Sequence, residues 1–169
     1  MRTWNEMNSG RARIILRKKI KMENVKYNQE DIVSHHGIAA IIKNEKGEVL
    51  IQKHIKYGFW TIPVGKVKQK QKVEEALKEE IFEECNLIIE NFKELTERDY
   101  IYNRDGNKVI VKSHLFEILN YSGKMKNNEH QKHKQQIFLS IDKIKELPYL
   151  SDMTLLFLET LGFKRDARI

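Results

Sequence analysis

The sequence predicts one α/β (α+β) domain, a sandwich in which strand pairs alternate with two helices around a mixed β-sheet. Short aliphatic runs separated by turn signals are typical of strands, and two other segments carry apolar residues at helical spacing. The chain has 169 residues, about the length of one domain, and 40% of them are hydrophobic, which is enough for one core. Strands interleaved with helices in this way indicate a layered fold.

Five apolar segments are expected to form strands: residues 38–42, 49–51, 95–102, 109–119 and 137–141. Gly47 marks a turn between the first two, and the Asp105-Gly106 pair marks a hairpin turn between the next two. Residues 57–65 contain a proline and two glycines, which indicates a loop. Residues 120–135 form a polar stretch before the last strand.

Two helices are expected. The clearer one spans residues 72–85 and has an apolar stripe of residues four apart: Val73, Leu77, Ile81 and Cys85. The second begins after Ser151, a good N-cap residue, and runs through Leu161 to Gly162, which stops it. Because Cys85 lies on the apolar stripe, it is expected to be buried as a small hydrophobic residue.

The positive charge of the chain is unevenly distributed. The formal net charge of +7 on its own suggests an anionic partner such as nucleic acid or nucleotide. Residues 1–21 hold seven basic residues and one acidic residue, so most of the net charge lies there. We therefore predict a basic N-terminal arm at residues 1–30 and a folded domain at 31–169. The arm is either loosely docked, or a phosphate contact, or partly untranslated because synthesis starts at Met22.

A reducing, cytoplasmic location is expected. Cys85 is the only cysteine, so the chain cannot form an internal disulfide, and no Cys/His cluster has the spacing of a zinc site. The longest apolar run, residues 38–42, is far shorter than the ~18 residues that suggest a membrane span. No apolar segment follows the first basic residues, so neither a signal peptide nor a membrane partner is expected.

Acidic residues are concentrated on the helix expected at residues 72–85. Glu80, Glu83 and Glu84 are spaced i, i+3 and i+4, so their carboxylates share one face, with Cβ atoms roughly 5–6 Å apart. One interpretation is a solvated acidic face, which the other glutamates of the helix favour: Glu74, Glu75 and Glu79. The other interpretation is that a hard divalent cation, Mg²⁺ or Mn²⁺, relieves the repulsion beside a phosphate chain.

This helix and the loop before it resemble the Nudix box, whose pattern is Gly-x5-Glu-x7-Arg-Glu-U-x-Glu-Glu-x-Gly-U, with U a bulky aliphatic residue. The approach to the box reads Trp60-Thr61-Ile62-Pro63-Val64. The box itself reads Gly65-x5-Gln71-x7-Glu79-Glu80-Ile81-Phe82-Glu83-Glu84-Cys85-Asn86-Leu87. The resemblance extends from about residue 32 to 162 and implies a Nudix-like α/β/α sandwich with a mixed sheet.

Three positions depart from the Nudix pattern. Asn86 replaces the second glycine, a mild change because Asn also adopts the left-handed conformation that ends a helix. Gln71 replaces the first glutamate and Glu79 replaces the arginine, a pair that holds the loop against the helix in the family. A hydrogen bond between Gln71 and Glu79 would replace that charged pair only in part. The lost positive charge would also make the site more acidic.

The resemblance implies a Nudix-type hydrolase that cleaves a diphosphate (pyrophosphate) linkage in a nucleoside diphosphate derivative, with Mg²⁺ or Mn²⁺ as cofactor. The three metal ligands of the family are kept as Glu80, Glu83 and Glu84. The candidate catalytic residues are Glu80, Glu84 and Glu129, with Glu80 or Glu129 accepting the proton of the attacking water. Glu129 is included because many family members carry a further glutamate in the corresponding loop.

Gly65, Lys66 and Trp60 are the candidate substrate-binding residues. Gly65 would let the backbone approach a ligand or adopt an unusual φ, and with Lys66 it would line the phosphate path. Trp60 and Phe59 would stack on a base, although aromatic residues before a core helix more often pack in the core. His130 and His133 are candidates for titration near neutrality. Neighbouring lysines indicate first a solvated basic loop: Lys126, Lys132 and Lys134.

Two alternatives remain open on the sequence alone. Gln71 and Glu79 suggest a catalytically impaired nucleotide-binding module that no longer turns its substrate over. The basic arm and the basic stretch at residues 101–140 suggest an RNA 5′-end pyrophosphohydrolase or decapping enzyme. The expected partner is a nucleotide or a nucleoside diphosphate-linked small molecule. RNA is the second candidate, and the sequence also allows a homodimer.

Overall fold

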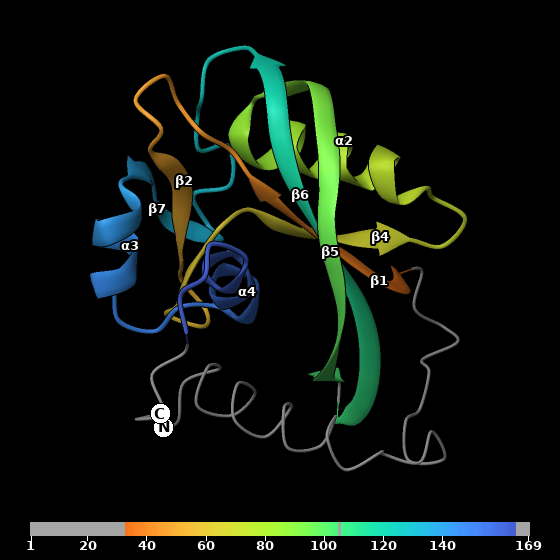
Figure 1. Cartoon of the computed structure of the whole chain (residues 1–169). Helices are drawn as coiled ribbons and strands as arrows, with labels where there is room; N and C mark the ends of the chain where they lie inside the picture. Colours follow the sequence, from red (N-terminus) through yellow and green to blue (C-terminus); the bar gives the residue numbers. More distant parts are fainter. Residues whose placement is uncertain (1–32, 105, 165–169) are drawn as a thin grey trace.

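Seven strands and three helices make up the part of the chain that the computed structural model describes, residues 33–104 and 106–164 (Figure 1). The elements in chain order are β1 (Val33–Ile41), β2 (Val49–His54), β3 (Trp60–Thr61), β4 (Val64–Lys68), α2 (Val73–Cys85), β5 (Ile88–Arg104), β6 (Asn107–Ser122), β7 (His133–Leu139), α3 (Ile141–Glu146) and α4 (Asp152–Thr160). The predicted arm at residues 1–30, the alternative start at Met22 and the turn residue Asp105 lie outside the described residues. None of the helices described here has both the length and the apolar character that crossing a bilayer requires.

The strands form two sheets. A four-stranded sheet has the order β4-β1-β6-β5, and a three-stranded sheet has the order β3-β2-β7. Strand β1 runs parallel to β6, where Ala39 pairs with Leu115, and antiparallel to β4, where Ala39 pairs with Val64. The other ladders in the described part are antiparallel. The predicted α/β (α+β) class with a mixed sheet is therefore confirmed.

Helices cover both faces of the four-stranded sheet, which gives the molecule α/β/α layers (Figure 1). Side chains of a strand point alternately to its two faces. Ile38 and Ala40 of β1 accordingly pack in the core under α2, whereas Ala39 and Ile41 pack in a second core with residues of α3 and α4. Strand β1 is therefore buried on both faces, which explains the unbroken apolar run at residues 38–42.

The predicted strands at residues 38–42 and 49–51 belong to different sheets, although they are consecutive in the chain. An antiparallel bridge between Lys43 and Val49 links them after β1 has ended. Both strands are buried on both faces. A strand with two apolar faces has no polar side to show which sheet it joins, so the pattern could not reveal this separation.

Two other predictions need correction. The loop predicted at residues 57–65 contains the short strand β3 and the first two residues of β4, because pairing with β2 and β1 overrides its glycine and proline signals. The strand predicted at residues 137–141 ends at Leu139. Ser140 then caps α3, and its Oγ accepts a hydrogen bond from the Lys143 N–H over 3.3 Å. That helix of 6 residues is too short for a periodic pattern to show.

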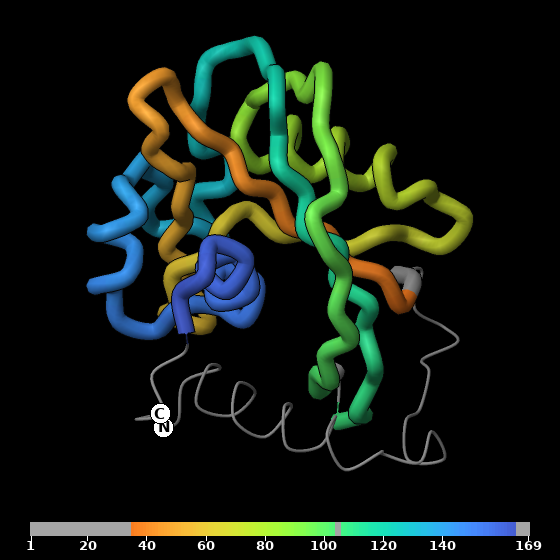
Figure 2. The backbone as a smooth tube through the Cα atoms, in the orientation of Figure 1, coloured from red at the N-terminus to blue at the C-terminus, as the bar shows by residue number. Residues whose placement is uncertain are grey.

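The β5–β6 hairpin is longer than the strands predicted at residues 95–102 and 109–119. Its ladder begins at the Ile88–Ser122 pair and ends beside Gly106, whose φ of 81° fits the predicted hairpin turn. Figure 2 shows the hairpin extending beyond β1 and β4, the other two strands of its sheet. The far half of this hairpin carries residues that border the cavity described below.

Helix α2 matches the prediction for residues 72–85 to within one residue. Asn86 ends it in the left-handed conformation, with φ 61° and ψ 27°, as expected from the substitution of glycine by asparagine. Cys85 is buried, as its place on the apolar stripe predicts. The helix therefore packs its apolar face on the sheet and directs Glu80 toward the cavity beside it.

Candidate active site

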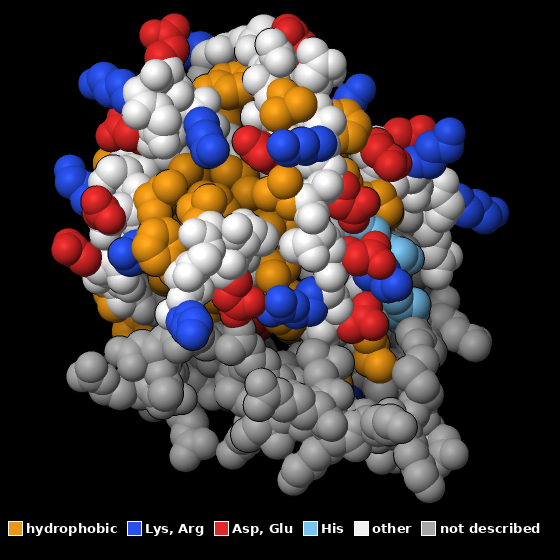
Figure 3. Space-filling view, viewed as in Figure 1, with side chains coloured by type: hydrophobic (Ala, Val, Ile, Leu, Met, Phe, Trp, Pro, Cys, Tyr) orange, Lys and Arg blue, Asp and Glu red, His pale blue; other side chains and the backbone are white. Residues whose placement is uncertain are grey.

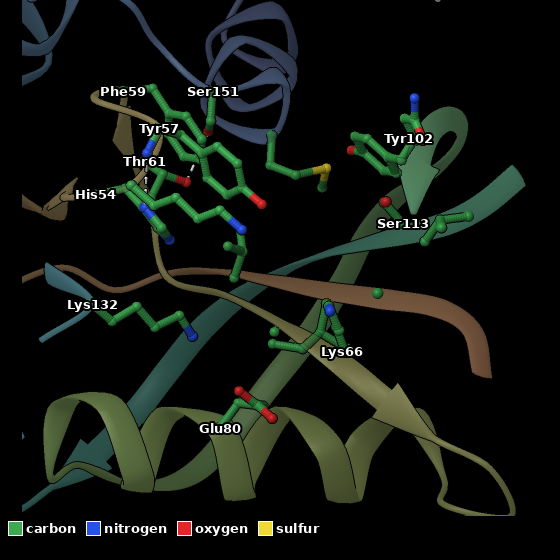
Figure 4. A pocket seen from close by; sticks show the side chains of 18 residues that line it. His54, Tyr57, Phe59, Thr61, Lys66, Glu80, Tyr102, Ser113, Lys132 and Ser151 are labelled. Atoms are coloured by element: carbon green, nitrogen blue, oxygen red, sulfur yellow. Dashed lines mark hydrogen bonds between the residues drawn. The ribbon is translucent and has the colours of Figure 1, made fainter. Parts of the chain in front are cut away.

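A cavity of about 490 Å³ is bordered by residues of α2, β1, β4, β6 and α4. Glu80 points into it from α2, Gly65 and Lys66 contribute from β4, and Lys132 contributes from the segment before β7 (Figure 4). Aromatic side chains form another part of its lining, here called the aromatic wall: His54, Tyr57 and Phe59. The cavity thus brings an acidic group, basic groups and planar rings to one space.

Gly65 and Glu80 are packed against each other. A Cβ added at Gly65 would lie 2.4 Å from Glu80 Cγ and 2.6 Å from both Cδ and Oε2 of Glu80. The φ of Gly65 is not positive, so this glycine does not serve an unusual backbone conformation. It is needed because a side chain at position 65 would occupy the space through which Glu80 reaches the cavity.

Glu80 and Glu84 both have a perturbed acidity. Burial raises the pKa of Glu80 to about 7, against the opposing charge of Lys132. Burial likewise raises the pKa of Glu84 to about 7, again opposed by Lys132. Glu84 is only 1% exposed. Both carboxyl groups therefore gain from a nearby cation, which stabilises their charged forms.

Lys132 joins two of the candidate carboxylates. Its Nζ donates a hydrogen bond to Glu84 Oε1 over 2.7 Å and lies 3.5 Å from Glu129 Oε2. Gln52 Nε2 donates to the other Glu84 oxygen over 3.4 Å. Lys132 is half-buried, so the prediction that it belongs to a solvated loop is wrong for this residue. The Lys132–Glu84 pair spans 48 positions of the chain, a separation that no local pattern reveals.

Glu129 lies in a turn before β7. Its carbonyl oxygen accepts hydrogen bonds from the N–H groups of Lys132, over 2.9 Å, and His133, over 2.8 Å. Its Oε2 atom is buried and accepts no hydrogen bond. His133 is 1% exposed, and burial together with the charge of Lys132 lowers its pKa to about 4. His133 is therefore neutral near pH 7, and its burial contradicts the expectation of a solvated loop at this residue.

Four of the candidate residues lie outside the cavity lining: the buried Glu84, Glu129 in its turn before β7, Glu83 and Trp60. Glu83 is exposed on α2, where its charge raises the pKa of Glu80. Trp60 is half-buried against the second core, and Lys53 Nζ lies 5.2 Å from the centre of its ring. This placement favours the packing interpretation of Trp60. Of the aromatic residues considered for base stacking, Phe59 is the one that lines the cavity.

The residues that depart from the Nudix pattern form a hydrogen-bonded link between the loop and the helix, here called the loop–helix clamp (Lys68, Gln71 and Glu79). Gln71 Nε2 donates to Glu79 Oε2 over 2.6 Å, which confirms the expected hydrogen bond. Lys68 Nζ donates to Glu79 Oε1 over 2.5 Å, and the Lys68 N–H donates to Gln71 Oε1 over 3.0 Å. The hydrogen bond from Lys68 lowers the pKa of Glu79. Lys68 at the end of β4 therefore supplies the positive charge that the arginine of the Nudix pattern would supply from the helix.

A second group of metal-ligand residues lies on β5 and β6. One ligand atom from each of Glu94, Glu97 and His114 lies within 4.8 Å of the others. His114 Nδ1 is 2.5 Å from Glu94 Oε1, and His114 Nε2 is 2.8 Å from His36 Nδ1. Lys112 Nζ is 3.5 Å from Glu97 Oε1. Figure 3 shows histidines among acidic and basic side chains on this side of the molecule. Because these groups already partner one another, we interpret the cluster as a surface ion network.

The carboxylates around Lys132 fit a hard divalent cation. The charges of Glu80 and Glu129 both raise the pKa of Glu84, so the three groups lie close enough to repel one another. Carboxylate oxygens are the protein ligands that Mg²⁺ and Mn²⁺ prefer. Glu129 Oε2 is a carboxylate oxygen of this kind, and it accepts no hydrogen bond. The carboxylates at the cavity edge are therefore of the chemical type that suits the predicted metal, but among the described residues no three of them bring their oxygens within 4.8 Å of one another.

The fold and the site together define a class of protein: an α/β/α sandwich in which a glycine-containing strand and the glutamate-bearing helix that follows it border a cavity. The family pattern described as the NUDIX domain matches residues 33–155. The chain therefore belongs to the Nudix hydrolase family. A search among curated proteins gives no match.

Solved structures of the same fold are numerous. The MutT NUDIX hydrolase from Burkholderia pseudomallei is 28% identical, with a TM-score of 0.61 over 73% of this chain and 95% of that chain. The NUDIX domain of Shewanella oneidensis NrtR, solved with ADP ribose, is 10% identical, with a TM-score of 0.62 over 89% of this chain and 96% of that chain. A C. elegans Ap4A hydrolase is 23% identical, with a TM-score of 0.54 over 76% and 98%. The last two likenesses show the fold alone.

Proposed function

We propose that this protein is a divalent-metal-dependent pyrophosphohydrolase that cleaves a diphosphate linkage in a nucleoside diphosphate derivative. The observation that carries the proposal is the entry of Glu80 into a cavity that lysines and aromatic rings also line. Carboxylates suit a cation, lysines suit phosphates and rings suit a base. A nucleotide derivative needs all three in one space.

The carboxylates divide into two roles. Glu80, Glu83 and Glu84 would hold Mg²⁺ or Mn²⁺ through their oxygens. An ion held there would neutralise phosphate charge and lower the pKa of a water. Glu80 lines the cavity, which supports it as the group that would accept a proton from a water there, and Glu129 is the second candidate for this role. Glu84 is buried behind the cavity and contributes charge and a ligand oxygen.

The aromatic wall suits a nucleotide base. The ring of His54 lies 4.7 Å from that of Tyr57 and 5.3 Å from that of Phe59, measured between centroids. Burial lowers the pKa of His54 to about 4, so its ring is neutral near pH 7. Lys66 and Lys132 provide the cations for phosphate oxygens. One similar domain was solved with ADP ribose and another similar structure is an Ap4A hydrolase, which supports a nucleotide derivative as substrate.

The test is Mg²⁺-dependent turnover of a substrate panel with the products identified. The panel contains nucleoside triphosphates, ADP-ribose and dinucleoside polyphosphates. We expect release of a nucleoside monophosphate or phosphate by the wild type, and a loss of about 100-fold or more in Glu84→Gln. Glu74→Gln is the matched control, because Glu74 is exposed on the same helix. Equal background rates for the wild type and Glu84→Gln on every substrate would refute the proposal.

A nucleotide-binding module without turnover is the second candidate, since Gln71 and Glu79 replace a charged pair of the family. Tight nucleotide binding in calorimetry without turnover would favour it, and restored turnover in Gln71→Glu with Glu79→Arg would explain it. The RNA alternative depends partly on residues 1–21, which lie outside the described residues. Unchanged RNA affinity and salt dependence after their deletion would argue against the arm as an RNA contact. The cytoplasmic location and a homodimer stay predictions.

A further inference from the structure

Lys132 occupies a position among the carboxylates where a cation is expected. Its Nζ lies 2.7 Å from Glu84 Oε1 and 3.5 Å from Glu129 Oε2. The Lys132 side chain is 38% exposed, whereas that of Glu84 is 1% exposed. The ammonium group therefore sits at the cavity edge of a carboxylate cluster whose deepest member is almost sealed from solvent.

The cluster needs positive charge to stay ionised. A buried carboxylate left without a partner is strongly destabilising. The ammonium group of Lys132 contacts Glu84 Oε1 over 2.7 Å. It supplies one positive charge where a divalent ion would supply two.

We infer that Lys132 is a resident monovalent cation of the site. Its ammonium group holds a cation position between Glu84 and Glu129, and a divalent ion takes that position only when Lys132 turns away. The inference rests on the proposed metal-dependent function. Because Lys132 also lines the cavity, the displaced ammonium group remains beside the space proposed for substrate phosphates. Lys132 thus competes with the ion in the free protein and faces the phosphates in the loaded one.

The inference is tested by measuring Mn²⁺ affinity with the full chain, from the electron paramagnetic resonance signal of free Mn²⁺. Lys132→Met removes the competing charge, so Mn²⁺ is expected to bind about tenfold more tightly, or better. Lys132→Arg keeps the charge and is expected to stay near the wild-type affinity. Lys134→Met is the matched control, because Lys134 is exposed two positions further along the chain. It is expected to leave the affinity unchanged.

An unchanged or weaker Mn²⁺ affinity in Lys132→Met overturns the inference, because Lys132 would then support the ion instead of competing with it. Thermal unfolding gives a second readout. Without Mn²⁺ the variant leaves Glu84 with the Gln52 hydrogen bond but without the ammonium group that contacts it, and is expected to melt below the wild type. Saturating Mn²⁺ is expected to raise its melting temperature more than that of the wild type. A variant that stays unfolded in saturating Mn²⁺ also overturns the inference, since the ion should replace the ammonium group.

The same experiment separates this inference from the proposed function. If Lys132→Met gains Mn²⁺ affinity while neither protein turns over any substrate of the panel, the resident-cation role stands and the hydrolase function falls. If turnover is found but Mn²⁺ affinity is unchanged in Lys132→Met, the hydrolase function stands and the resident-cation role falls.

Discussion

Substituting Gly65 by alanine tests how strand β4, which precedes α2, positions Glu80. The added methyl group would lie 2.4 Å from Glu80 Cγ and 2.6 Å from Glu80 Cδ and Oε2. Ordinary carbon–carbon contacts are about 3.5–4.0 Å. The Glu80 side chain must therefore move by about 1 Å or more. It is flexible enough to do so without unfolding the helix, but it then leaves its place in the cavity.

The expected size of the effect follows from that displacement. A misplacement of about 1 Å in a catalytic group costs on the order of 100-fold in rate. We therefore expect Gly65→Ala to lose about 100-fold in kcat. The melting temperature should change little, because the clash is with a movable side chain and the φ of Gly65 is not in the left-handed region.

The measurement is steady-state turnover with saturating Mg²⁺, together with thermal unfolding, for Gly65→Ala and a control. Gly47→Ala is the control: Gly47 lies in a turn, and a Cβ there meets nothing within 4 Å. Its φ of +76° is unfavourable for alanine, so the substitution should lower stability without moving a residue of the site. Wild-type kcat in folded Gly65→Ala would refute the positioning role, and so would an equal loss in both variants.

Three further outcomes are expected. Lys68→Met removes the cation of the loop–helix clamp beside Glu79 and should lower activity about tenfold, measured as kcat and KM. Unchanged kinetics would show that Gln71 alone is enough to hold Glu79. In metal-free protein, the free energy of unfolding should fall as the pH rises from about 4.5 to about 7, because Glu80 and Glu84 keep their protons to higher pH in the folded state than in the unfolded one. Denaturant titrations across this range check the slope, which Glu84→Gln should flatten, and a flat wild-type profile would contradict it. Tyr57→Ala should raise KM about tenfold through lost stacking, with a smaller effect on kcat, and a loss in kcat alone would contradict the role of the aromatic wall.

The features that the sequence predicts well depend on local chemistry. Helix α2 follows from an apolar stripe with a spacing of four, and Asn86 ends it because that residue tolerates the left-handed conformation. The Gln71–Glu79 hydrogen bond follows from replacing a charged pair by two groups that still reach each other. In each case the interacting residues lie within about two helical turns or within one loop and the helix that follows it.

The features that the sequence misses depend on contacts between distant segments. Lys132 is one of several lysines in a polar stretch, and only the fold places it against Glu84. Lys68 likewise gains its role from the approach of β4 to α2, which brings it to Glu79. The assignment of β1 and β2 to separate sheets has the same cause, since both strands are apolar on both faces.

Hydrolysis in ¹⁸O-labelled water tests the central claim most directly. The wild type is incubated with Mg²⁺ and a substrate from the panel, and the products are analysed by mass spectrometry. Cleavage of a diphosphate linkage predicts one ¹⁸O atom in a phosphate-containing product, dependent on Mg²⁺ and lost in Glu84→Gln. Products without ¹⁸O in phosphate, or the same labelling by Glu84→Gln and the wild type, would contradict the assignment of a pyrophosphohydrolase site to α2 and its cavity.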